Sequence, residues 1–79
     1  MGGVVKSGVV AHDNACLLAE ITRQNAVIGV AQSPSGQATV NASEVAYHRA
    51  IIASAKLNNG GNGVEASIGA LRLLGTGGT

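Results

Sequence analysis

The segment from residue 41 to 61 constrains the fold most, because it alone combines a helix start, a one-sided apolar pattern and a helix stop. Asn41 and Glu44 have the spacing of a capping box, in which each side chain satisfies a free amide of the first turn. The run Asn-Asn-Gly-Gly at 58–61 readily adopts the left-handed conformation that closes helices. The sequence therefore predicts an amphipathic helix over this segment.

One side of this predicted helix carries small and apolar side chains, whereas Arg49 and Lys56 lie on the opposite side. Alanines on a helix face allow another helix to approach closely. We therefore predict that this face is a contact surface. Its predicted residues are Ala46, Tyr47, Ala50, Ile51, Ala53 and Leu57.

Two valine pairs around Gly8 favour a strand over residues 3–11. Asp13 or Asn14 is then expected to cap a second helix that ends near Asn25. The wheel of that helix separates an apolar from a polar side. We expect Leu17, Leu18 and Ile21 to face the core, and Glu20, Arg23 and Gln24 to face water.

Residues 26–40 allow two interpretations. The β-rich stretches on either side of Ser-Pro-Ser-Gly at 33–36 predict a hairpin with a turn at that tetrad. Alternatively, residues 26–36 resemble residues 50–60, which indicates a repeated helix end in an all-helical chain. The hairpin is favoured, because a glycine inside a helix costs about 1 kcal/mol and Gly29 is flanked by β-branched residues.

The last element has an uncertain type. Asn62 and Glu65 repeat the capping spacing and predict a short helix, although residues 63–68 can also form a strand. Residues 75–79 are expected to be a flexible, glycine-rich tail. The predicted fold is thus one α+β domain over residues 1–79, of order β-α-β-β-α plus a last element, with helices on a short antiparallel sheet. The alternative is an all-α helical hairpin repeat.

Composition favours self-association. The 79 residues include one aromatic side chain, Tyr47, so the core must be thin. Charged residues make up 11% of the chain, against about 25% in typical globular proteins. A surface so poor in charge is expected to be covered by further copies of the chain.

Other partners and compartments follow from what the sequence lacks. The cations are scattered, so nucleic-acid binding is not expected, and no apolar run approaches the about 20 residues of a membrane span. A single cysteine and no secretory signal favour a cytoplasmic location.

The clearest reactive cluster is His12-Asp13 with Cys16, because His12 and Cys16 stand one helical turn apart. A thiol beside an imidazole is the arrangement of an activated nucleophile, or half of a zinc site. The chain has no second cysteine, and we favour the interpretation that Asp13 is a cap and Cys16 a small buried residue.

Two weaker motifs also allow a functional and a structural interpretation. Glu44 and His48 are spaced as an acid–base couple, but such pairs more often form a solvated helix face. Residues 61–66 fit a phosphate-binding glycine pattern, but that fingerprint requires a preceding strand, whereas a helix is expected here. Both motifs are therefore interpreted as structural.

These observations predict a non-enzymatic, self-associating protein, either a structural subunit or an accessory module of a homo-oligomeric assembly, with no cofactor and no metal. The alternative is a small ligand-binding or regulatory domain, with Tyr47 and the loop at 58–63 at its pocket.

Overall fold

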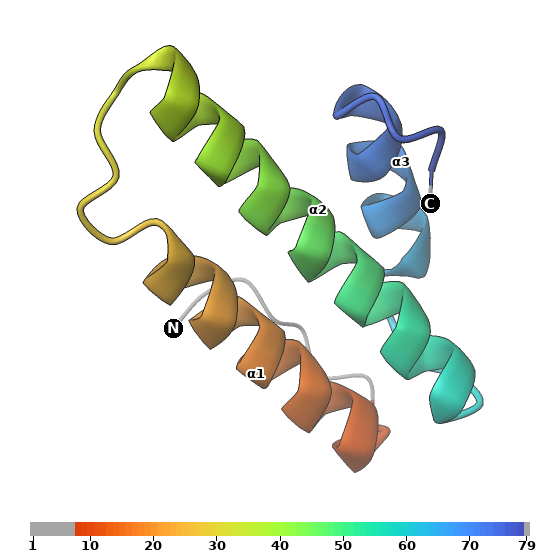
Figure 1. Ribbon diagram of the computed structural model, residues 1–79. Coiled ribbons are helices and arrows are strands. Elements are labelled where there is room, and N and C mark those ends of the chain that lie inside the picture. Colours follow the sequence, from red (N-terminus) through yellow and green to blue (C-terminus); the bar gives the residue numbers. More distant parts are fainter. Residues whose placement is uncertain (1–7, 79) are drawn as a thin grey trace.

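Three helices make up the fold of residues 8–78, the part of the chain that the computed structural model describes. They are α1 (Val10–Ala26), α2 (Pro34–Leu57) and α3 (Val64–Leu73). The first two form an antiparallel hairpin, and α3 lies on the other side of α2 (Figure 1). Residues 8–78 contain no strand, so the predicted α+β fold is wrong and the all-helical alternative agrees with the structure.

The predicted hairpin over residues 26–40 is replaced by a loop and the first turns of α2. Ser33 is the N-cap of α2, and its Oγ accepts a hydrogen bond from the Gly36 amide at 3.0 Å. Pro34 occupies the first helical position, where its missing N–H has no cost. The Ser-Pro-Ser-Gly tetrad that was interpreted as a turn therefore starts a helix.

The central helix consequently begins earlier than predicted and ends where predicted. Asn41 lies inside α2, where its Oδ1 accepts a hydrogen bond from Gln37 Nε2 at 2.9 Å, so the capping box with Glu44 is wrong. At the other end, the Gly60 amide donates to the Ala55 carbonyl at 2.8 Å, and Asn59 has a φ of 56°. The Asn-Asn-Gly-Gly run thus closes α2 as expected.

The predicted N-terminal strand is wrong in its described part, since α1 begins at Val10; residues 3–7 of the prediction lie outside the described residues. The predicted cap is also displaced, because the Asp13 amide already donates to the Val9 carbonyl at 2.9 Å. A valine pair is a weak β signal that tertiary contacts override. The predicted end near Asn25 is close to the observed end at Ala26.

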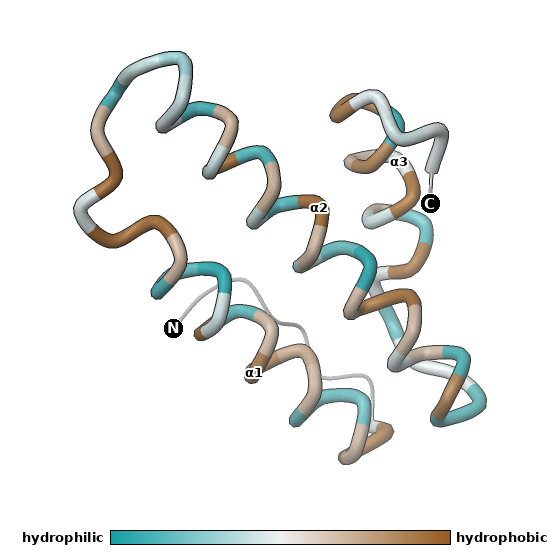
Figure 2. Tube along the Cα trace, in the orientation of Figure 1, coloured by the Kyte–Doolittle hydropathy of each residue, from teal (hydrophilic) through white to brown (hydrophobic). Residues whose placement is uncertain are grey.

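The orientation of α1 differs from its predicted amphipathicity at most positions, although Gln24 is exposed as expected. Its buried residues are His12, Asp13, Cys16 and Glu20, whereas Leu18 and Ile21 are 65% and 51% exposed. Polar side chains can be buried when partners satisfy their hydrogen bonds. The connection to α2 likewise starts with apolar residues (Figure 2), and Ile28 within it is 75% exposed.

The last element is the helix that its apolar spacing predicted, but its cap differs. Gly63, with a φ of 87°, is the N-cap of α3 and makes no side-chain hydrogen bond, so the Asn62–Glu65 capping box is not used. Leu71 is fully buried. Beyond the helix, the Thr76 amide donates to the Leu71 carbonyl at 3.0 Å. The predicted flexibility of residues 75–79 stays a prediction.

Candidate functional site

His12 is the centre of a buried polar contact that joins three parts of the fold. Its ring is 0% exposed, with Nδ1 at 2.9 Å from Ser54 Oγ on α2 and Nε2 at 3.0 Å from the Asn62 carbonyl in the α2–α3 loop. A carbonyl only accepts, so Nε2 donates to Asn62, and Nδ1 and the Ser54 hydroxyl share a second hydrogen bond. Asn58 Nδ2 lies 3.2 Å from Ser54 Oγ and can donate to it. These hydrogen bonds fasten α1 to α2 and to the loop.

The Cys16 thiol lies over the His12 ring rather than at its edge. Sγ is 3.4 Å from Nε2 and 4.0 Å from Nδ1, and a sulfur close to both ring nitrogens must lie above the ring plane. The Nε2 hydrogen points to Asn62 instead. Burial raises the pKa of the Cys16 thiol, and the nearby Asp13 carboxylate raises it further. This geometry does not activate a nucleophile, which requires a lowered thiol pKa.

In the folded protein, we expect thiolate absorbance to give a Cys16 pKa above the free-cysteine value of about 8.5. In urea, which unfolds the chain, we expect a pKa near that value. Because the folded-state pKa is raised, the thiol contributes stability that is present below the unfolded-state pKa and is lost as the pH rises through the folded-state pKa. Circular dichroism at each pH controls for unfolding. A folded-state pKa below the free-cysteine value of about 8.5 would contradict this description.

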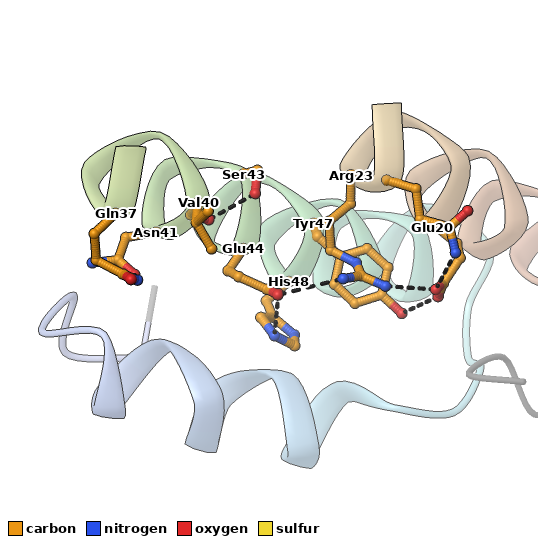
Figure 3. A network of polar contacts seen from close by, with 10 residues as sticks. Glu20, Arg23, Gln37, Val40, Asn41, Ser43, Glu44, Tyr47 and His48 are labelled. Atoms are coloured by element: carbon orange, nitrogen blue, oxygen red, sulfur yellow. Dashed lines mark hydrogen bonds and ion pairs between the residues drawn. The ribbon is translucent and has the colours of Figure 1, made fainter. Parts of the chain in front are cut away.

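A second polar cluster connects all three helices and is centred on Glu20, which is 5% exposed (Figure 3). Glu20 Oε1 accepts from Arg23 at 2.6 Å, and Oε2 accepts from the Tyr47 hydroxyl at 3.1 Å. The Arg23 guanidinium also lies over the Tyr47 ring, with its carbon 5.0 Å from the ring centroid. One carboxylate thereby holds a cation of α1 and the aromatic residue of α2 together.

The cluster continues along α2 to α3. Glu44 Oε1 lies 3.4 Å from Arg23 Nη1, and its other oxygen lies 3.7 Å from His48 Nε2. His48 Nδ1 is 3.1 Å from Ser67 Oγ on α3. The Glu44–His48 distance is too long for a hydrogen bond, and the closer partners of the two groups are Arg23 on α1 and Ser67 on α3, in line with the structural interpretation of this motif.

The contacts of this cluster hold its side chains in fixed positions. Burial raises the pKa of Tyr47, as do the charge of Glu20 and the hydrogen bond to it, so the phenol stays protonated and donating. Arg23 Nε is buried without a hydrogen-bond partner, which shows that the guanidinium is placed by its other contacts. Sequence reasoning placed Glu20 and Arg23 in water, because no single-helix pattern reveals a partner on α2.

The glycine pattern at residues 61–66 serves the core. A Cβ on Gly61 would lie 2.6 Å from both Cγ and Nε2 of His12, so the loop backbone is pressed against the buried ring. Gly63 then caps α3. The glycine at position 61 of this pattern therefore permits a close approach of the backbone to His12.

An open groove runs between α1 and α2. Apart from Arg23, its lining is uncharged. Lining residues include Ala15, Leu18 and Ala19 from α1 and Ala46, Tyr47 and Ala50 from α2. The contribution of α1 was missed, although its Ala15, Ala19, Thr22 and Ala26 recur at the spacing of one helix face.

The six predicted contact residues are distributed over different environments. Ala46, Tyr47 and Ala50 line this groove. Ile51 is buried in the core, and Leu57 is 85% exposed. Ala53 lines a second groove, between α2 and α3, whose edge carries Arg49 and Lys56. The structure therefore brings half of the predicted set together.

Two kinds of site are absent from residues 8–78. No three histidine, cysteine, aspartate or glutamate side chains lie close enough together there to hold a metal. No helix in this range combines the length and apolar character needed to cross a bilayer.

Comparison with protein-family models, curated proteins and solved structures found no match to the chain. Its function is therefore inferred from its own geometry.

Proposed function

We propose that this chain is a non-enzymatic helical module that associates with copies of itself, as a structural subunit or an accessory part of a homo-oligomeric assembly. The observation that carries the proposal is the orientation of α1, which buries its carboxylates and leaves Leu18 and Ile21 exposed. An isolated small domain gains more by burying such side chains, each worth about 1.5–3 kcal/mol. Their exposure supports a surface that a partner covers.

The polar clusters support the same proposal, because the buried groups are engaged in contacts between the helices. Cys16 has a raised pKa, and the hydrogen bonds of His12 are used between helices. Glu20 is held by Arg23 and Tyr47. Each reactive group therefore has a structural task in the monomer.

The alternative of a ligand-binding domain required Tyr47 and the loop at 58–63 to share a pocket. The residues that line the groove at Tyr47 include none from that loop. The loop instead contacts His12 through Gly61 and Asn62. No observation favours this second function.

Thermal melting at two protein concentrations tests the proposal. Association that stabilises only the folded chain makes the melting temperature depend on concentration. We follow the melting midpoint by circular dichroism and expect it to rise by several degrees when the protein concentration is raised about 100-fold. A midpoint that is the same at both concentrations would contradict the proposal.

A further inference from the structure

We propose that a second copy of this chain occupies the groove between α1 and α2, in a two-fold symmetric dimer. This inference rests on the proposed function and names its contact surface. The groove-bearing side of the helical hairpin is called the groove face below; its residues used here are Ala15, Leu18, Ala19, Ala46 and Ala50.

The size of the groove face is sufficient for a dimer. The 17 residues of α1 give a face about 25 Å long at 1.5 Å per residue. Two packed helices, about 9 Å apart and each about 11 Å across, give a width of about 20 Å. A flat face would then bury about 500 Å² per copy, or about 1,000 Å² per pair, which is the lower limit for a specific interface. The walls of the groove add to this area.

The charge distribution favours this face over the groove between α2 and α3. Among the residues that line the groove, Arg23 alone is charged, and Glu20 and Glu44 already neutralise it. Burying the groove lining therefore leaves no new unpaired charge. The groove between α2 and α3 carries Arg49 and Lys56, and a two-fold contact there would bring like charges together.

The shape of the groove face suits a copy of itself. A two-fold interface uses the same patch twice, so that patch must contain both a projection and a hollow. Leu18 projects from α1 with 65% of its surface exposed, beside the hollow formed by the small side chains Ala46 and Ala50. The Leu18 ridge of one copy can enter the hollow of the other, so the same apolar patch supplies both sides of the contact.

Sedimentation equilibrium of the full chain and three variants tests the inference. Leu18→Glu and Ala46→Glu place a carboxylate on the groove face from α1 and α2, at positions that are exposed in the monomer. Both variants are expected to raise the dimer dissociation constant at least about 100-fold, because each substitution buries an unpaired carboxylate against apolar side chains of the other copy. Leu73→Glu makes the same change at a residue of α3 that is 92% exposed, and is expected to change the constant by less than about threefold, the scale of a surface substitution.

The outcomes separate the inference from the proposed function. If the unmodified chain associates and Leu18→Glu or Ala46→Glu leaves the dissociation constant unchanged, the groove face is not the contact and the inference fails, while self-association stands. If the unmodified chain is monomeric at every concentration, both fail. Circular dichroism of each variant must match that of the unmodified chain, which confirms that association rather than folding has changed.

Discussion

Gly61→Ala is expected to be among the most destabilising single substitutions in the chain, and the neighbouring Gly60→Ala is its matched control. The two glycines have almost the same backbone angle, with φ of 140° and 138°. A Cβ at position 60 meets nothing within 4 Å, whereas one at position 61 would overlap the His12 ring. The pair therefore separates backbone strain from a steric clash.

Backbone strain at these angles costs about 1–3 kcal/mol and is common to both variants. The clash adds about 1–3 kcal/mol for Gly61→Ala, because His12 is fully buried and its two ring nitrogens are fixed by hydrogen bonds. Urea unfolding followed by circular dichroism measures both free energies. Equal losses for the two variants would show that His12 does not occupy the described position.

Glu20→Ala is expected to lower the free energy of unfolding by about 2–4 kcal/mol, less than the ~3–5 kcal/mol for breaking a fully buried ion pair, because the Arg23 side chain is 26% exposed. Glu20 is 5% exposed and accepts hydrogen bonds from Arg23, Gln24 and Tyr47. Its removal leaves the Arg23 guanidinium and the Tyr47 hydroxyl poorly partnered.

Glu44→Ala is the control, because Glu44 also contacts Arg23 but its side chain is 32% exposed and the contact is longer, at 3.4 Å. Its loss is expected to cost less than about 1 kcal/mol, as for other exposed ion pairs. Both substitutions introduce alanine into a helix, so helix propensity changes in the same direction. Similar losses from the two variants would mean that Glu20 is not the centre of the cluster.

Local signals predicted the C-terminal ends of α1 and α2 better than they predicted the fold class. The close of α2 followed from the Asn-Asn-Gly-Gly run, whose backbone preference needs no tertiary contact. The start of α2 was missed because Ser33-Pro34 satisfies the chemistry of a turn and of a helix N-terminus equally well. This ambiguity led to the predicted hairpin and, together with the predicted strand at the N-terminus, to the predicted α+β fold.

The sidedness of α1 could not be read from the sequence of α1 alone. Burying Glu20 depends on Tyr47, 27 residues later, whose hydroxyl donates to it in addition to the donors on α1. Burying His12 likewise depends on Ser54 and on the Asn62 carbonyl. Patterns within one helix predict exposure from hydrophobicity, whereas these positions are decided by partners on other elements.

The alanine face of α2 was predicted from the sequence, but its neighbour was not. Ala46 and Ala50 line one side of the groove, and residues of α1 line the other side. Ile51 was assigned to the same surface because wheel positions alone do not distinguish a contact within the chain from one between chains.

Self-association is tested most directly by molar mass from light scattering on a sizing column, at two loadings that differ about tenfold, a range over which a reversible equilibrium shifts measurably. The chain alone has a mass of 7.8 kDa. We expect a mass of at least twice this value at the higher loading, with any decrease at the lower loading following a reversible equilibrium. A mass of 7.8 kDa at both loadings would contradict the proposal that this chain is a self-associating module.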